Sequence, residues 1–257
     1  MSFRIALITG AARGIGAAIA RRLAKDGFDI TINDLPSKIP ELESLQKEIS
    51  SMGRRVYIHT ADVSDTGEVE NMVDSTVKTL GGIDVMVANA GIGWVSPLTE
   101  CTEDIWDRIM AVNARGVFLC YKYAAKAMIA QGRGGRIIAA SSVLGKQVPP
   151  GTSLRSAYCA SKFAVRGLTQ SAAQELGKHG ITVNAYAPGP IDTPINDELG
   201  LDEAAKEAYI ANDIKGTVVG RIGEPDEVAS LVSYLASKES GFMTGQTVSI
   251  NGGYFFD

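Results

Sequence analysis

The chain contains seven short apolar runs, rich in β-branched residues, separated by segments long enough to form helices. The runs cover residues 4–9, 29–34, 55–60, 83–89, 136–141, 182–186 and 246–250. Spread over 257 residues, they recur about every 37 residues, the length of a strand plus a crossover helix. Most are almost continuously apolar, as strands are when helices cover both faces of their sheet.

This pattern predicts an α/β fold with a Rossmann-like, doubly wound, parallel seven-stranded sheet and helices on both faces. Ile15, Ile19 and Leu23 repeat every four residues between the first two runs, like the buried face of a helix. No linker, repeat or low-complexity tract interrupts residues 1–257, so we expect one domain. Ligands of such sheets bind outside the carboxyl ends of the strands, where the strand order reverses.

Composition excludes several classes of function. The chain has 25 basic and 29 acidic residues and no basic cluster, which argues against nucleic acid as a partner. The uncharged run over 241–256 is too short and polar to span a membrane, and no secretory signal is expected. Cys101, Cys120 and Cys159 lack C-x-x-C spacing, which predicts no metal site and favours a cytoplasmic, reducing location.

A glycine-rich turn follows the first run and opens directly into a helix. It reads Thr9-Gly10-Ala11-Ala12-Arg13-Gly14-Ile15-Gly16, with G-x-x-x-G-x-G spacing. Glycines at such a turn allow positive φ and bring backbone N–H groups close to a pyrophosphate. We therefore expect Gly10, Arg13, Gly14, Ile15 and Gly16 to contact a dinucleotide, although such turns also serve plain strand-to-helix geometry.

Asp34 ends the second run, 24 residues after Gly10. A carboxylate there can accept hydrogen bonds from the adenosine ribose hydroxyls and repels a 2′-phosphate, which favours NAD(H). Arg13 can instead pair with a 2′-phosphate, so NADP(H) stays open. The alternative for Asp34 is a helix-capping or solvated carboxylate.

Tyr158 and Lys162 lie at i and i+4 of a strongly helical stretch and therefore share one helix face. A phenol has a pKa near 10, and a neighbouring ammonium group can lower it enough for acid–base chemistry. An aromatic–lysine pair on a surface helix is the alternative.

These motifs occur in a fixed order together with Asn89-Ala90-Gly91, Asn113, Ser141-Ser142 and Pro188-Gly189-Pro190-Ile191-Asp192-Thr193. In this combination the chain resembles the single-domain branch of the short-chain dehydrogenase/reductase family, over residues 4–253. The resemblance implies an oxidoreductase that interconverts a secondary alcohol and a ketone with NAD(P). A non-catalytic dinucleotide-binding sensor is the alternative from another class.

The resemblance also implies a role for each catalytic residue. Tyr158 is the general acid/base, Lys162 lowers its pKa and holds the nicotinamide ribose, and Ser142 binds the substrate oxygen. Asn113 supports a water relay to Lys162, unless it merely caps the following helix. Ser141 is the alternative to Ser142.

Further cofactor contacts follow from the same resemblance. The residues implied are Asp62 and Val63 near the adenine, Asn89, Ala90 and Gly91 after the fourth strand, and Pro188, Gly189, Ile191 and Thr193 around the nicotinamide. Asp62 can alternatively be a helix N-cap. The chain has Ala88 where the family usually has a first asparagine, so one structural hydrogen bond is expected to be missing. The segment from Ser142 to Tyr158 is a few residues longer than usual, and it should bulge beside the substrate.

For the substrate, the expected contacts are Trp94, Val143, Leu144, Pro190 and Ile195, with a lid near 190–215. An apolar pocket suits a small or medium, weakly charged ketone. The chain looks most like acetoin/diacetyl reductases (2,3-butanediol dehydrogenases), and also like 3-oxoacyl-carrier-protein reductases.

The helix expected over 112–129 carries charge only at Arg115, Lys122 and Lys126. Its apolar surface is wider than one sheet face requires, which favours a subunit interface over a helix buried in one subunit. Together with the family resemblance, this predicts a homo-oligomer, specifically a homotetramer.

Overall fold

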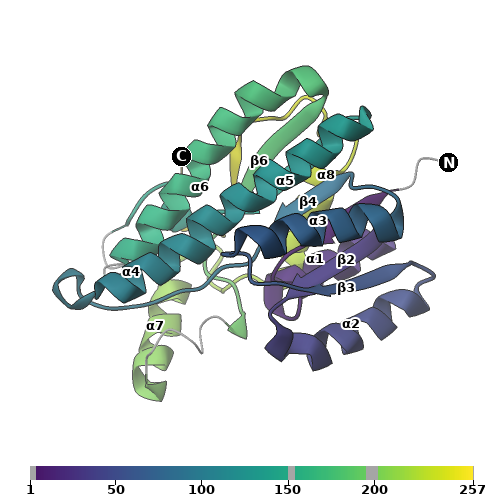
Figure 1. The fold of residues 1–257 in the computed structure, drawn as a ribbon. Helices are drawn as coiled ribbons and strands as arrows, with labels where there is room; N and C mark the ends of the chain where they lie inside the picture. The colour runs from purple at the N-terminus through teal and green to yellow at the C-terminus, as the bar shows by residue number, and fades with distance from the viewer. Residues whose placement is uncertain (1–3, 150–153, 195–201, 257) are drawn as a thin grey trace.

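All seven expected strands form in the computed structural model, which describes residues 4–149, 154–194 and 202–256. They are β1 (Ile5–Ile8), β2 (Asp29–Asp34), β3 (Val56–Thr60), β4 (Val85–Ala88), β5 (Gly135–Ala140), β6 (Ile181–Pro188) and β7 (Thr247–Ile250). Every pair is parallel, and the order across the sheet is β3-β2-β1-β4-β5-β6-β7. The expected doubly wound architecture is confirmed, and the order reverses between β1 and β4 (Figure 1).

Helices cover both faces of the sheet. They are α1 (Gly14–Lys25), α2 (Ile39–Ser51), α3 (Thr66–Leu80), α4 (Glu103–Met110), α5 (Gly116–Gln131), α6 (Ser156–Leu176), α7 (Glu203–Gly216) and α8 (Pro225–Ala236). One core cluster joins the sheet to α1, α2 and α8, and a second joins it to α3, α5 and α6. Because both faces are buried, the strands read as apolar runs instead of alternating ones.

The strand ends differ slightly from expectation. The sequence predicts the sixth strand over 182–186, whereas β6 continues to Pro188 because it keeps pairing with β7 as far as Ile250. Apolar pattern alone does not fix such boundaries, since the neighbouring strand decides where pairing stops.

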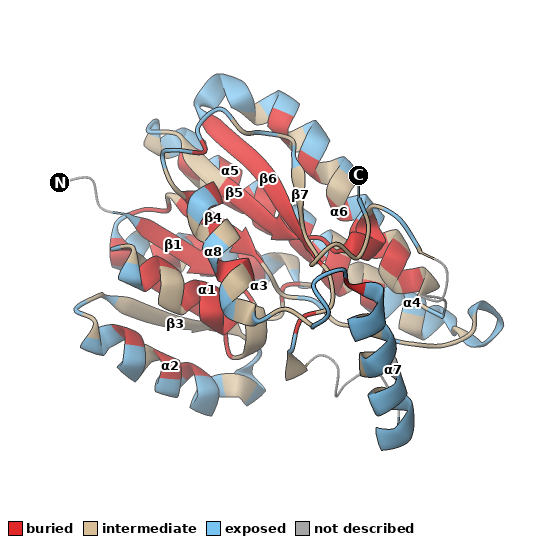
Figure 2. Ribbon diagram, turned by 180° about the vertical axis from the view of Figure 1, so that it is seen from behind, coloured by how far each residue is buried: buried red, intermediate tan, exposed pale blue. Residues whose placement is uncertain are grey.

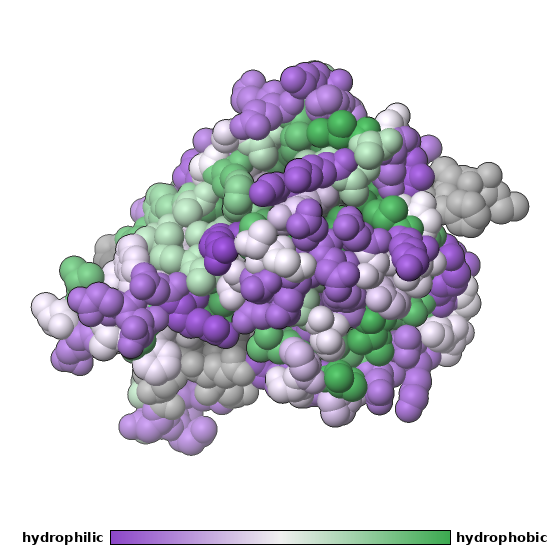
Figure 3. Space-filling model, viewed as in Figure 1, coloured by the Kyte–Doolittle hydropathy of each residue, from purple (hydrophilic) through white to green (hydrophobic). Residues whose placement is uncertain are grey.

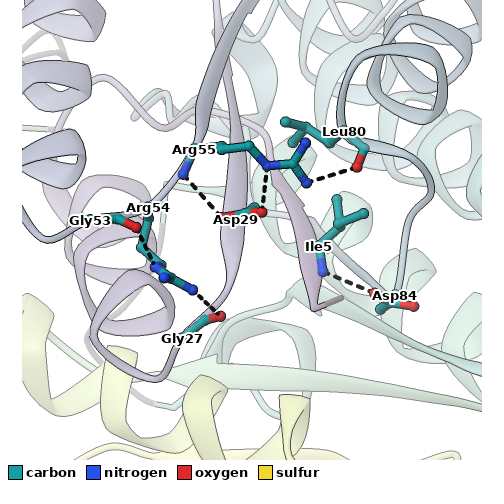
Figure 4. Close-up of polar contacts among 8 residues, drawn as sticks. All are labelled: Ile5, Gly27, Asp29, Gly53, Arg54, Arg55, Leu80 and Asp84. Atoms are coloured by element: carbon teal, nitrogen blue, oxygen red, sulfur yellow. Dashed lines mark hydrogen bonds and ion pairs between the residues drawn. The ribbon is translucent and has the colours of Figure 1, made fainter. Parts of the chain in front are cut away.

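Charged side chains hold the amino ends of the strands, at the sheet edge opposite the expected ligand edge (Figure 4). The Asp84 carboxylate accepts a hydrogen bond from the Ile5 backbone N–H at 2.9 Å. Asp29 accepts hydrogen bonds from the backbone N–H and Nε of Arg55, whose guanidinium also donates to the Leu80 carbonyl. This edge stabilises the fold and leaves the other edge for chemistry.

Helix α7 stands apart from the layers. Figure 2 shows it projecting beyond the carboxyl ends of the strands, with exposed residues along its length. Among the described residues, no helix is both long and apolar enough to cross a membrane.

Candidate active site

A cavity of about 700 Å³ opens at the carboxyl ends of the central strands, where the strand order reverses. Most of the residues singled out from the sequence line it. They are Gly10, Arg13, Gly14, Ile15, Gly16, Asp34, Asp62, Val63, Asn89, Ala90, Gly91, Ser142, Val143, Leu144, Tyr158, Lys162, Pro188, Gly189, Pro190, Ile191 and Thr193. Asn113 and Trp94 do not line it, and Ile195 lies outside the described residues.

The glycine turn is closely packed on its neighbours. Gly10 and Gly14 have φ of +64° and +54°, which disfavour any side chain. A Cβ at Gly16 would lie 2.1 Å from the Gly10 carbonyl oxygen, so only glycine fits there. The first turn of α1 contains no acidic residue and Arg13 provides no side-chain cap, which leaves backbone N–H groups for an anion such as a pyrophosphate.

Asn89 holds this turn in place. Its Nδ2 donates to the carbonyls of Thr9 and Gly10, at 2.9 and 3.1 Å. Its Oδ1 accepts a hydrogen bond from the Tyr186 hydroxyl at 2.7 Å. Tyr186 is fully buried, also borders the cavity, and was not identified from the sequence, because the contact spans 97 positions. Ala88, at the position of the family's first asparagine, is simply a buried residue of β4.

Asp34 lies at the end of β2 and borders the half of the cavity where the adenosine is expected to bind. Its carboxylate accepts hydrogen bonds from the backbone N–H groups of Ala12, at 3.0 Å, and Leu35, at 2.9 Å. It therefore fixes the glycine turn, and it does not occupy the N-cap of α2, which is Lys38.

Asp62 is not the N-cap of α3 either, since Asp65 takes that position. Although partial burial acts to raise its pKa, hydrogen bonds from Ser64 and the nearby Arg108 guanidinium hold the pKa of Asp62 below its usual value. Arg108 lies 3.8 Å away and borders the cavity, as does Lys38. Neither basic residue was identified from the sequence.

Ser142, Tyr158 and Lys162 come together on one wall of the cavity. Tyr158 and Lys162 project from α6, and Ser142 follows β5 as the N-cap of a short 3-10 turn, η4 (Val143–Gly145). The Ser142 hydroxyl hydrogen-bonds the Tyr158 phenol. Ser141 instead donates to the Lys162 carbonyl at 3.1 Å, so its hydroxyl is engaged inside the fold.

Burial governs the protonation of this pair. It raises the pKa of Tyr158, and the hydrogen bond with Ser142 only partly opposes the rise. It also lowers the pKa of Lys162 to about 8. The Lys162 Nζ donates to the Ala140 carbonyl at 2.9 Å and lies 5.6 Å from the centre of the Tyr158 ring. The lowered tyrosine pKa that the sequence suggests is therefore not found, and Tyr158 is a proton donor at neutral pH.

Asn113 lies in a π-helical turn, η3 (Ala111–Arg115), inserted between α4 and α5. Its amide holds both backbone groups of Ile92 at 2.9 Å and donates to Ser161 of α6 at 3.2 Å. It is not a helix cap, and it positions the loop after β4. A Cβ on Gly91 would lie 3.3 Å from both Asn113 Oδ1 and Lys162 Nζ, so the two polar groups flank that glycine. A water relay between them remains a prediction.

The substrate end differs most from expectation. Val143, Leu144 and Pro190 line the cavity, but Trp94 is 39% exposed and does not, whereas its neighbour Val95 does. The remaining wall comes from the segment expected to bulge beside the substrate, from the expected lid, and from Tyr254, the one residue of this wall that was not identified from the sequence. The residues are Leu154 and Arg155 before α6, Ala205, Ala208, Asn212 and Asp213 on one face of α7, and Tyr254 near the end of the chain.

Comparison with known proteins agrees with this geometry. A family model described as enoyl-(acyl carrier protein) reductase matches residues 10–255. A short-chain dehydrogenase/reductase of Armillaria gallica is 50% identical over 99% of this chain and 97% of its own. The L-2,3-butanediol dehydrogenase of Corynebacterium glutamicum is 38% identical over 99% of both chains. The diacetyl reductase [(S)-acetoin forming] of Staphylococcus aureus is 40% identical over 98% of both.

Solved structures that are similar to this chain come from the same family. A short-chain type dehydrogenase/reductase from Mycobacterium marinum has a TM-score of 0.91 and 37% identity, covering 98% of this chain and 95% of its own. A short-chain dehydrogenase from Burkholderia cenocepacia in complex with NADP has a TM-score of 0.87 and 37% identity, covering 98% and 97%. The chain belongs to the short-chain dehydrogenase/reductase family and is a single-domain, dinucleotide-binding oxidoreductase.

The buried ammonium of Lys162 predicts a measurable cost in stability. Its pKa is about 8 when folded, below its ordinary value of 10.5, so at pH 7 the folded state carries a desolvated charge. Lys162→Met should therefore raise the free energy of unfolding at pH 7 by about 1–2 kcal/mol, because loss of the hydrogen bond to the Ala140 carbonyl offsets part of the gain. The difference should shrink as the pH rises from 8 to 10.5, where the wild-type folded state loses its proton before the unfolded state does.

Urea unfolding at pH 7 and pH 9.5 measures this difference. Lys178→Met, which removes an exposed lysine after α6, is the matched control and should leave stability nearly unchanged. A Lys162→Met protein that is less stable than wild type at pH 7 would show that the buried ammonium of Lys162 does not destabilise the fold.

Proposed function

We propose that this oxidoreductase interconverts a small or medium, weakly charged ketone and its secondary alcohol, with an NAD(P) coenzyme. The observation that carries the proposal is that Ser142, Tyr158 and Lys162 share one cavity with the glycine turn. A binding protein that only senses dinucleotides would have no need of that set. The similarity to a butanediol dehydrogenase and a diacetyl reductase supports this class of substrate.

The cavity residues also support a mechanism. A nicotinamide dinucleotide, when bound, supplies or accepts the hydride. The hydroxyls of Ser142 and Tyr158 are the donors for a carbonyl oxygen that becomes negatively charged during reduction. Because burial raises the pKa of Tyr158, its phenol holds the proton that this oxygen then takes. Lys162 supplies a cation one helical turn away, beside the expected ribose position.

The coenzyme would lie along the wall from the glycine turn to the loop after β6. The glycine turn fits a pyrophosphate, because its backbone can approach closely at positions where a side chain would clash. We propose NAD(H) as the favoured coenzyme, since the Asp34 carboxylate is fixed by two backbone N–H groups at the adenosine end. The alternative coenzyme is NADP(H), since the basic residues Arg13, Lys38 and Arg108 border the same region.

The substrate would lie between the catalytic wall and α7. We propose that residues near 190–215 act as a lid, since Ala205, Ala208 and Asp213 of α7 border the cavity. Val95, Val143 and Leu144 give the enclosed space apolar walls, which suit a weakly charged ketone.

We also propose that the chain forms a homo-oligomer, and specifically a tetramer. Trp106, Phe118, Ile129 and Phe163 are each at least 40% exposed on α4, α5 and α6. Figure 3 shows apolar surface over this part of the molecule, where α5 and α6 run alongside one another.

We propose a cytoplasmic location. Cys101, Cys120 and Cys159 are free, which supports this location.

Replacing Tyr158 tests the proposed reaction. Tyr158→Phe should lower kcat for ketone reduction by about 100-fold or more, because the proton donor is lost. Binding of NADH, followed by its fluorescence, should change little. Activity is measured by nicotinamide absorbance over a panel of ketones and alcohols with both coenzymes.

Tyr234→Phe, on the exposed face of α8, is the matched control for this series. A Tyr158→Phe enzyme with wild-type kcat would refute the assigned role. A wild-type protein that binds NADH but turns over nothing in the panel would favour the non-catalytic alternative.

Replacing Asp34 tests the coenzyme preference. Asp34→Ala should raise the ratio of kcat/KM with NADP to kcat/KM with NAD by about 10-fold or more. Repulsion between the Asp34 carboxylate and a 2′-phosphate about 4 Å away would weaken NADP binding by about 1–4 kcal/mol. Asp34→Asn keeps a hydrogen-bond acceptor for Ala12 and should shift the ratio in the same direction. An unchanged ratio in both variants would sink the assignment to NAD(H).

A further inference from the structure

The last residues of the chain return to the cavity. After β7, the turn at Asn251–Tyr254 brings Tyr254 to the cavity wall, where it packs against the cluster of Val143, Leu144 and Cys159. Tyr158 packs against the same cluster. The end of the chain therefore forms part of the wall that also carries the catalytic tyrosine.

Hydrogen bonds fix this turn. Gly253 donates its backbone N–H to the Asn251 side chain at 3.0 Å, and the Asn251 Nδ2 donates to the Phe255 carbonyl at 2.9 Å. Gly252 and Gly253 have φ of +60° and +79°, which permit the tight reversal. The position of the Tyr254 ring is thus set by local backbone geometry.

The same ring also contacts the end of α7. A Cβ on Gly216, the last residue of α7, would lie 2.5 Å from the Cε2 atom of Tyr254, so the ring rests directly on that glycine. The Tyr254 hydroxyl donates to Asp213 Oδ1 at 3.5 Å, a long hydrogen bond. Just beyond α7, the Val219 N–H donates to the Gly252 carbonyl at 3.1 Å. Side-chain and backbone contacts therefore join the chain end to α7.

Burial and charge keep Tyr254 a donor. Its partial burial raises its pKa, and the Asp213 carboxylate adds to the rise, while Arg155 opposes it. A protonated phenol beside a carboxylate is a stable arrangement over the neutral pH range.

We propose that Tyr254 determines substrate length, by closing the substrate end of the cavity and holding the C-terminal end of α7 against it. The inference rests on the proposed function, because it identifies which ketones the same cavity accepts. An aromatic ring fixed at the wall limits the apolar chain that can extend beyond the reacting carbonyl. It therefore selects short ketones over their longer homologues.

The first test compares diketones of increasing length. The probes are diacetyl, 2,3-pentanedione, 2,3-hexanedione and 2,3-heptanedione, reduced with NADH. Tyr254→Ala should raise kcat/KM for the longest relative to the shortest by about 10-fold or more, because removing the ring opens the wall. Tyr254→Phe keeps the ring and should keep the wild-type length profile. Phe256→Ala, which removes an 83% exposed ring two residues on, is the matched control.

The second test needs no substrate. Amide hydrogen exchange in residues 203–216 should be faster in Tyr254→Ala than in wild type, and unchanged in Phe256→Ala. Gly216→Ala forces the ring aside and should also speed exchange. In the Tyr254→Ala background the same glycine substitution should add little, since the ring it displaces is absent.

The length profile and the amide exchange together distinguish failure of the Tyr254 inference from failure of the proposed function. Equal length profiles in wild type and Tyr254→Ala, or equal exchange in α7, would overturn the inference about Tyr254. If wild type reduces none of the diketones, the proposed function fails in that form, whereas the exchange experiment still decides whether Tyr254 holds α7.

Discussion

One side-chain amide, that of Asn89, connects the parts on which the site depends. It donates to the carbonyls of Thr9 and Gly10 after β1 and accepts from the Tyr186 hydroxyl of β6. Both N–H groups of the amide and one lone pair of its oxygen are thus used inside the fold. The glycine turn, which would hold the pyrophosphate, and the strand that leads to Pro188 and Gly189 are therefore fixed relative to each other. Rotation of this amide would leave buried carbonyls without a donor, at a cost of about 1–3 kcal/mol.

The cavity wall formed by Tyr158 and Lys162 combines two unfavourable burials. Tyr158 resists losing its proton there, and Lys162 resists keeping its own. A phenol that holds its proton in a dry cavity is suited to donate it when a carbonyl oxygen gains charge. In the oxidation of an alcohol the same tyrosine oxygen would have to accept a proton instead. Burial of the Lys162 ammonium costs stability, and such locally unfavourable arrangements are typical of functional sites.

The sequence predicts the sheet and most of the cavity, because those parts depend on local pattern. Apolar runs indicate strands that are buried on both faces of the sheet. Glycines are required in the turn because backbone segments approach each other closely there. Tyr186, Tyr254 and Arg108 were not identified, since their importance comes from contacts between segments far apart in the chain. Trp94 was expected beside the substrate because of its loop position, yet Val95 lines the cavity instead. In a loop without a regular period, sequence alone does not decide which of two neighbours faces inward.

The reaction that we propose for this cavity is hydride transfer between a nicotinamide coenzyme and a ketone carbon. Deuterium transfer tests this reaction: NADH with deuterium at both C4 positions is incubated with diacetyl, and the alcohol formed is analysed by mass spectrometry and NMR. Wild type should form alcohol with deuterium at the new carbinol carbon, and Tyr158→Phe should form about 100-fold less of this alcohol per unit time. An alcohol formed without deuterium at that carbon, or labelled alcohol formed at the wild-type rate by the Tyr158→Phe enzyme, would overturn the proposed reaction.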